Sequence, residues 1–324
     1  MNDCIRFIGV KVWGDVKSLL MGVRPFIRIL AIRRRMTKPV VGFIGTGVMG
    51  KSMAGHILAA GYPLVVYNRT KEKANELLKN GAKWANSPKE LVKQADIVFT
   101  IVGMPSDVEE VYLSENGLIE NGRSGQIFID MTTSKPSLAV HIYQTAQSKG
   151  IHTLDAPVSG GDIGARNGTL AIMVGGDKEI FDRVQDLLNV LGNNIVYQGK
   201  AGSGQHTKMC NQIAIATNMI GVCESLIYAK KAGLDPEMVL KSISTGAAGS
   251  WSLSHLAPRI LKEDFEPGFY IKHFIKDMKI ALEEAEKMNL SLPGLSLAKQ
   301  MYEELSAKGE ESSGTQALIK YWAE

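Results

Sequence analysis

Near the start of the first regular pattern in this chain, residues Val40–Gly50 read VVGFIGTGVMG. The apolar run ends at Ile44, and helical spacing follows the third glycine. In this spacing the first glycine permits a tight turn, the second lets the backbone approach a pyrophosphate, and the third allows close packing of helix on strand. The stretch predicts a strand–turn–helix unit with phosphates at the helix N-terminus, although a glycine-rich turn without a ligand is the alternative. The expected cofactor contacts are Gly45, Thr46, Gly47, Val48, Met49 and Gly50.

From this unit onward, apolar runs of strand length alternate with stretches of helical spacing. Such alternation is typical of a parallel sheet covered by helices on both faces. We therefore predict an α/β protein that begins with a doubly wound, Rossmann-type sheet. The expected strands are Val40–Ile44, Leu64–Tyr67, Ile97–Val102, Gln126–Asp130, His152–Asp155, Leu170–Val174 and Asn194–Tyr197.

After Gly199 the strand-like runs stop, and the expected elements are all helices. The first of these, Ser203–Ala232, is apolar nearly all round, which predicts a buried helix. We therefore divide the chain into three parts. These are a leader (residues 1–35), a dinucleotide-binding domain (residues 36–199), and an all-helical substrate and oligomerisation domain (residues 200–324). Ligands prefer domain junctions, so we expect the functional site near residues 199–204.

One amine lies close to that junction. The stretch Gly202–Asn211 reads GSGQHTKMCN, and it places Lys208 and Asn211 three residues apart, on one face of the long helix. A lysine inside an apolar helix usually has a partner or a task. A solvated lysine in the first turn is the alternative, and the position at the junction favours a functional lysine.

The end of the second expected strand bears on the choice of cofactor. Asn68, Arg69 and Thr70 stand where an acid about 20 residues past the glycine motif would bind a ribose 2′-hydroxyl group. No acid is present, and an arginine can pair with a 2′-phosphate and stack on adenine. The sequence favours NADP, with NAD as the alternative and a merely solvated Arg69 as the other interpretation.

Two further turns follow expected strands. Ser159, Gly160 and Gly161 offer unhindered backbone N–H groups, which suit a substrate carboxylate, although Ser-Gly-Gly is also a routine turn. Thr132 and Thr133 lie at the carboxyl edge of the sheet, where ligands bind, and a helix-capping role for them is equally compatible with the pattern.

Composition limits the classes of function. The chain has 324 residues, of which 45% are hydrophobic and 22% charged, and this is typical of a globular protein of about two domains. Residues 1–35 contain eight Lys or Arg residues and two acidic residues, which gives this segment a net charge of +6. The whole chain has a net charge of +4, so the remaining residues together carry −2. A basic surface for nucleic acid is therefore not expected. The three cysteines show no metal or disulfide spacing, which favours a reducing cytoplasm and no metal site.

The leader shows no strong fold signal. Its longest uncharged apolar stretch is too short to span a bilayer, so we expect no membrane partner, and a weak membrane-surface helix is the alternative. Deleting residues 1–35 is expected to leave the melting temperature and turnover unchanged, because this segment adds charge and no pattern that completes a core. A large fall in either quantity would show that the leader packs on the body of the protein.

Taken together in their order, these motifs resemble the β-hydroxyacid dehydrogenases. The resemblance runs from about Lys38 to the C-terminus. It rests on the glycine motif, Asp130–Thr133, Asp155–Gly161, the spacing Gly202-x-Gly-x-x-x-Lys208-x-x-Asn211, and Lys276-Asp277. The family includes 3-hydroxyisobutyrate dehydrogenase, tartronate semialdehyde reductase and glyoxylate/succinic semialdehyde reductase.

The resemblance implies roles for individual residues. Lys208 corresponds to the catalytic lysine, Asn211 assists at the substrate, and the Ser159–Gly161 turn binds the substrate carboxylate. The family pattern also places Thr133, Lys276, Met104 and Pro105 along the cofactor and active site. It further implies a homodimer or homotetramer built through the helical domain. Two positions depart from the family pattern: His56 replaces a common Asn, and Glu109 stands where some members have an Asn beside the cofactor.

The expected function is thus NAD(P)-dependent hydride transfer between a small hydroxy acid and its semialdehyde or oxo acid, with Lys208 as general acid and base. Within the family, 3-hydroxyisobutyrate is the first choice of substrate, and tartronate semialdehyde, glyoxylate or succinic semialdehyde are the alternatives. A non-catalytic dinucleotide-binding module or an imine reductase would share the fold, but either is expected to lack the lysine.

Overall fold

The computed structural model describes residues 38–322, so the expected leader lies outside the described residues. A nine-stranded sheet has the order β3-β2-β1-β4-β5-β6-β8-β7, with β9 paired to β8. The strands β1 to β6 run parallel, and the order reverses between β1 and β4. Their bounds are β1 Val41–Ile44, β2 Leu64–Tyr67, β3 Lys83–Trp84, β4 Ile97–Thr100, β5 Ile127–Asp130, β6 His152–Asp155, β7 Val158–Ser159, β8 Leu170–Gly176 and β9 Gly192–Gly199.

The strands from β1 to β6 are parallel, as predicted, but the sheet is not parallel throughout. β8 pairs antiparallel with β6 and with the short strand β7, while β9 runs parallel to β8. Apolar runs reveal where strands form but not their direction. The chain reverses between β7 and β8, where β7 pairs Val158 with Ile172 in antiparallel register. The short strands β3 and β7 were not predicted.

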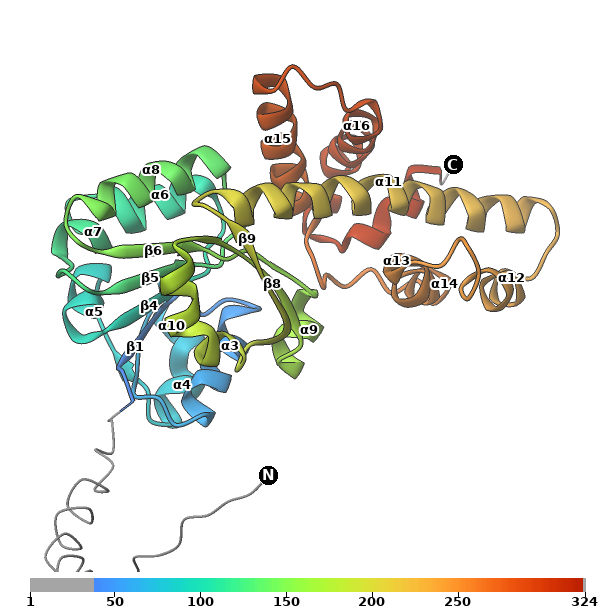
Figure 1. Ribbon diagram of the computed structural model, residues 1–324. Coiled ribbons are helices and arrows are strands. Elements are labelled where there is room, and N and C mark those ends of the chain that lie inside the picture. The colour runs from blue at the N-terminus through green and yellow to red at the C-terminus, as the bar shows by residue number, and fades with distance from the viewer. Residues whose placement is uncertain (1–37, 323–324) are drawn as a thin grey trace, which may run out of the picture. The chain divides into compact units, whose positions relative to one another are not determined.

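Helices cover both faces of the sheet (Figure 1). One core contains Met53, Ile57 and Phe181 from α3 and α10, and the other contains Leu91, Tyr112 and Ile142 from α5, α6 and α8. This arrangement confirms the doubly wound, Rossmann-type sheet. The helices of this part are α3 Gly50–Ala59, α4 Asn75–Lys79, α5 Pro88–Gln94, α6 Pro105–Leu113, α7 Leu118–Asn121, α8 Pro136–Gln147, α9 Gly161–Asn167 and α10 Lys178–Leu188, with the 3-10 helix η1 Lys71–Ala74.

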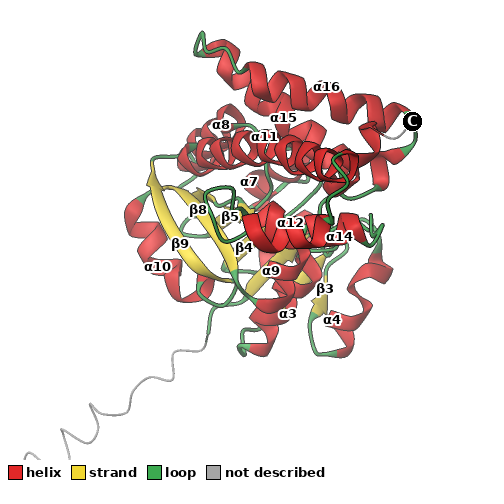
Figure 2. Ribbon diagram, turned by 90° about the vertical axis from the view of Figure 1, so that its right-hand side faces the viewer, coloured by secondary structure: helices red, strands yellow, loops and turns green. Residues whose placement is uncertain are grey.

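The second part of the described chain is helical, as predicted, and has its own apolar core. Figure 2 shows α11, α15 and α16 lying next to one another, and residues of these helices contact each other. The last segment, η3, is a 3-10 helix. The elements are α11 Ser203–Lys231, α12 Pro236–Ile243, α13 Trp251–His255, α14 Ala257–Leu261, α15 Ile271–Lys287, α16 Pro293–Ala307, η2 Glu310–Ser312 and η3 Thr315–Trp322.

The long helix α11 joins the two parts of the fold. It packs on β8 as well as on α15 and α16. Among the described helices, it alone is long and apolar enough to cross a membrane by length and composition. The sequence predicted a helix buried all round, but α11 is partly exposed, and Cys210 lies on its exposed side. A single chain leaves part of this apolar helix without a covering element.

Candidate functional site

The glycine loop after β1 is shaped for a pyrophosphate. Gly45 has φ +96°, and a Cβ there would collide with the carbonyl oxygen of Ile101. A Cβ at Gly50 would collide with the carbonyl oxygen of Gly45, which lets α3 approach the strand closely. At Gly47 a Cβ would meet no atom within 4 Å, so the backbone faces open space where a phosphate could approach.

Polar groups around this loop also fit a phosphate. Met49 precedes α3 and provides no side-chain cap, so no N-cap side chain competes with a phosphate for the start of the helix. The backbone N–H of Thr46 donates to Asn68 Oδ1 over 3.0 Å, which ties the loop to the end of β2. Within residues 38–322, the Thr46 hydroxyl is buried without a hydrogen-bond partner, while Val48 is exposed. The loop therefore fits a dinucleotide at this edge.

The turn after β2 contains Arg69, the arginine expected at the cofactor. Asn68 Nδ2 donates to the carbonyl of Thr70 over 2.8 Å and fixes this turn. The Arg69 side chain is 74% exposed, and its NH1 lies 3.0 Å from Asp107 Oδ1. The backbone N–H of Met104, next to Pro105, donates to the other Asp107 oxygen over 2.9 Å. Asp107 was not predicted from the sequence, where its only signal is its place in the first turn of α6.

A buried ionic cluster joins the end of β5 to α15. Lys276 Nζ donates to the carbonyl oxygen of Thr133 over 2.7 Å and lies 2.8 Å from Asp277 Oδ1. Asp277 is only 1% exposed. Two residues predicted at the site, Thr133 and Lys276, are thus in direct contact.

The side chain of Asn211 extends this cluster onto α11. Asn211 Nδ2 donates to Gln212 Oε1 over 2.7 Å, and Gln212 Nε2 donates to Asp277 Oδ2 over 2.6 Å. The chain of contacts therefore runs from Asn211 to the carboxylate that pairs with Lys276. Gln212 was not predicted from the sequence, and Asp277 was expected only as the neighbour of Lys276 in a family motif. A buried glutamine on an apolar helix was the available signal.

Lys208 is the buried amine at this cluster. It is 7% exposed, and among the described residues its ammonium has no hydrogen-bond or ion-pair partner. Burial lowers the pKa of Lys208 to about 8, the charge of Asp277 opposes this shift, and the charge of Lys276 adds to it. An amine with this pKa can hold or release a proton near neutral pH.

The Ser159–Gly161 turn lies between β7 and α9. Gly160 and Gly161 have φ +128° and +61°, a conformation that favours glycine and exposes N–H groups. A Cβ on Gly161 would lie 3.6 Å from the carbonyl oxygen of Gly268, which places a loop of the helical part against the turn. No hydrogen bond or ion pair within the described chain joins this turn to Lys208.

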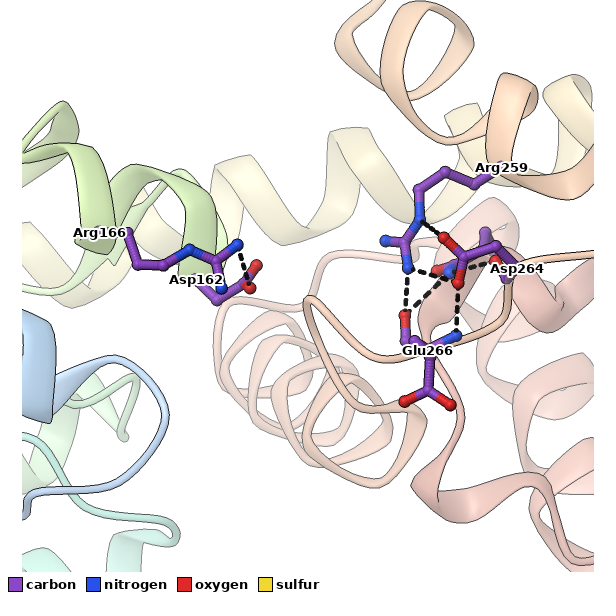
Figure 3. Close-up of polar contacts among 6 residues, drawn as sticks. Asp162, Arg166, Arg259, Asp264 and Glu266 are labelled. Atoms are coloured by element: carbon purple, nitrogen blue, oxygen red, sulfur yellow. Dashed lines mark hydrogen bonds and ion pairs between the residues drawn. The ribbon is translucent and has the colours of Figure 1, made fainter. Parts of the chain in front are cut away.

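Arg259 holds the loop that faces the turn (Figure 3). Its guanidinium donates to both carboxylate oxygens of Asp264, over 2.8 and 3.0 Å, and to the carbonyl oxygen of Glu266 over 2.6 Å. Asp162, the residue after the turn, pairs with Arg166 over 2.9 Å, and a Cβ on Gly268 would lie 3.0 Å from Asp162 Oδ1. The loop and the turn are therefore each braced by an arginine–aspartate pair.

A metal centre is not apparent in the part of the chain that the structure describes. Between residues 38 and 322, no three His, Cys, Asp or Glu side chains come close enough to hold an ion.

Comparison with known proteins decides the family. Residues 40–199 match the model of the NAD-binding domain of 6-phosphogluconate dehydrogenase. Residues 202–322 match the model described as "NAD-binding of NADP-dependent 3-hydroxyisobutyrate dehydrogenase". The chain belongs to the β-hydroxyacid dehydrogenase family. It is an oxidoreductase with an NAD(P)-binding fold.

Several relatives and a solved structure share nearly their whole length with this β-hydroxyacid dehydrogenase. An uncharacterised oxidoreductase YkwC of Bacillus subtilis is 65% identical over 88% of this chain and 99% of its own. A probable 3-hydroxyisobutyrate dehydrogenase-like protein of Arabidopsis thaliana is 51% identical, with coverages of 86% and 84%. The 2-hydroxy-3-oxopropionate reductase of Escherichia coli is 38% identical, with coverages of 86% and 96%. The Mycobacterium tuberculosis 3-hydroxyisobutyrate dehydrogenase structure with L-serine has a TM-score of 0.81 at 28% identity, over 89% of this chain and 100% of its own.

Proposed function

We propose that this protein interconverts a small hydroxy acid and its semialdehyde or oxo acid with NADP(H), using Lys208 as general acid and base. The observation that carries the proposal is the buried, unpartnered Lys208 ammonium with its pKa lowered to about 8. A structural lysine in the described fold would be expected to have an acceptor, because burying an unpaired charge is costly.

The nicotinamide, when bound, accepts or supplies the hydride. In oxidation, the neutral Lys208 amine takes the proton of the substrate hydroxyl group, and in reduction its ammonium returns that proton to the developing alkoxide. Asn211 donates to the substrate from the same face of α11, and the backbone N–H groups of Ser159–Gly161 bind its carboxylate. Lys276 holds the Thr133 carbonyl and keeps a second positive charge near Lys208.

NADP is the proposed cofactor because Arg69 follows the end of β2, at a place where a carboxylate would exclude a 2′-phosphate. Most of the Arg69 side chain is exposed, and its contact with Asp107 involves NH1, which leaves Nε and NH2 for a phosphate. Gly45–Gly50, Asn68, Thr70, Met104 and Pro105 line the proposed dinucleotide path. NAD is the alternative cofactor.

We further propose the domain division at residues 36–199 and 200–324, since β9 ends at Gly199 and α11 begins at Ser203. A cytoplasmic homodimer or homotetramer built through the helical part is also proposed. Exposed apolar side chains on that part support it, because single chains seldom leave many such groups uncovered. They include Tyr228, Leu234, Met238, Trp251, Met288, Leu290 and Leu297.

A substrate panel tests the proposal. Tartronate semialdehyde, glyoxylate and succinic semialdehyde are assayed as substrates for reduction, and 3-hydroxyisobutyrate for oxidation, each with NADP(H) and NAD(H) in parallel. Turnover of at least one compound with NADP(H) is expected. If none turns over while the dinucleotide still binds, the protein is a binding module and the proposal fails.

The pH dependence of turnover follows from the Lys208 amine. With a pKa of about 8, kcat/KM for oxidation is expected to rise with pH and level off above 8, because the neutral amine is the base. For reduction it is expected to fall above pH 8, because the ammonium is the acid. The two pH profiles are measured with the same hydroxy acid and its oxidised partner. If kcat/KM changes with pH in the same sense for oxidation and for reduction, the assignment of Lys208 is wrong.

A further inference from the structure

The first turn of α11 has an unusual cap. Its N-cap residue is Gly202, which has no side chain to accept a hydrogen bond, and φ there is +88°. The cap comes instead from Asp155, the last residue of β6. The backbone N–H of Gly202 donates to Asp155 Oδ1 over 2.8 Å, and that of Gln205 donates to Asp155 Oδ2 over 2.9 Å. The strand thus performs the task that an N-cap side chain usually performs within its own helix.

Two glycines leave room for this carboxylate. A Cβ on Gly175 would lie 2.6 Å from Asp155 Oδ1, and a Cβ on Gly204 would lie 2.9 Å from Asp155 Oδ2. Larger side chains at either position would push the helix away from the strand. Asp155 is 5% exposed, so water does not replace it easily as the acceptor.

The same turn of α11 is fixed on a second side. Gln205 Nε2 donates to the carbonyl oxygen of Thr132 over 2.7 Å, and Gln205 Oε1 accepts from the backbone N–H of Ser134 over 2.9 Å. These two residues flank Thr133, whose carbonyl oxygen accepts from Lys276. Lys208 follows Gln205 by three residues and therefore lies one turn farther along the same face.

We propose that Asp155 is a positioning residue for the reaction, which sets the place of Lys208 by holding the first turn of α11 against β6. The inference rests on the proposed role of Lys208. Proton transfer needs the amine within hydrogen-bond reach of the substrate oxygen, and displacement of a reacting group by about 1 Å can cost about a hundredfold in rate. Two charge-assisted hydrogen bonds to one turn of helix restrict that displacement.

The test is the substitution Asp155→Asn, which keeps the shape of the side chain but replaces one carboxylate oxygen by an NH₂ group. That NH₂ group then faces a backbone N–H group of α11, and two donors cannot form a hydrogen bond with each other. We expect kcat to fall about 10- to 100-fold, with the dissociation constant for NADPH within about twofold of the parent. Water admitted to the loosened turn is expected to raise the pKa of Lys208 from about 8 toward 10.5. That pKa is measured by competitive acetylation followed by mass spectrometry, which does not depend on turnover.

Ser87→Ala is the matched control. It removes a helix cap of similar kind, the bond from the Glu90 N–H to Ser87 Oγ over 3.1 Å, in α5, which carries no proposed site residue. Its kcat and its Lys208 pKa are expected to equal those of the parent even where its melting temperature falls. An Asp155→Asn protein that behaves like this control, or one that loses NADPH binding in parallel with kcat, would overturn the proposal.

Two further experiments distinguish a failure of the Asp155 proposal from a failure of the proposed function. If Lys208→Ala retains full turnover, the proposed function itself fails; if Lys208→Ala is inactive and Asp155→Asn is not impaired, only the role of Asp155 fails. Should Asp155→Asn not fold, hydrogen exchange on the parent protein decides. The amides of Gly202 and Gln205 are expected to be protected, and exchange as fast as at an uncapped helix end would refute the proposal.

Discussion

Replacing Lys208 by alanine is expected to reduce turnover by about 10²–10⁴-fold, because the proton transfer would lose its general acid and base. The protein is expected to fold normally. Among the described residues, the Lys208 ammonium has no hydrogen-bond or ion-pair partner that the substitution would leave unpaired. Removing a buried unpaired charge is not expected to lower the free energy of unfolding. The measurements are kcat with the best substrate of the panel, the melting temperature, and the dissociation constant for NADPH.

Lys230→Ala is the control for this substitution, since Lys230 is an exposed lysine near the other end of the same helix. Its turnover is expected to match the parent. A Lys208→Ala enzyme within tenfold of the parent would contradict the acid–base role. A variant that no longer binds NADPH would place Lys208 in the cofactor site instead.

Replacing Arg69 by alanine is expected to raise the KM for NADPH by about ten- to a hundredfold and to change the KM for NADH far less. A hydrogen bond to a charged group contributes about 1.5–3 kcal/mol, and only NADPH has a 2′-phosphate to receive it. The exposure of Arg69 and its ion pair with Asp107 favour the lower end of this range, because solvent and the carboxylate both weaken the added attraction.

Arg123→Ala serves as the control, because Arg123 is also a partly exposed arginine in an ion pair, with Asp96 at 2.6 Å. Both cofactors are expected to behave as in the parent. If Arg69→Ala raises the KM for NADPH and the KM for NADH by the same factor, Arg69 stacks on the adenine ring and does not bind the 2′-phosphate. A parent enzyme that prefers NADH would refute the interpretation of Asn68–Thr70, while the dehydrogenase assignment would stand.

Much of the fold could be predicted because its signals are local. The glycine spacing of residues 45–50 requires a tight turn between a strand and a helix, and that requirement is visible in the sequence. Apolar periodicity likewise revealed β1, β2, β4, β5 and β6 and the switch to helices after Gly199. The family match explains why these local patterns occur in this order.

Other features depend on contacts between distant residues. The direction of β8 follows from its pairing with β7, and an apolar run carries no information on direction. The exposure of Cys210 depends on which elements cover α11. The sequence of the helix alone does not show which other elements pack against it. Periodicity detects the faces of a helix but not the neighbours that those faces meet.

The candidate site divides in the same way. The sequence by itself determined the residue types that such chemistry requires: the glycine turn, an arginine in place of an acid at residue 69, and a lysine three residues before an asparagine on an apolar helix. Only the tertiary structure decided that Lys208 is buried beside Lys276 and Asp277, that Gln212 joins Asn211 to Asp277, and that Asp155 caps α11. The pKa of an amine depends on water access and nearby charge, and both come from segments far apart in the chain that folding brings together.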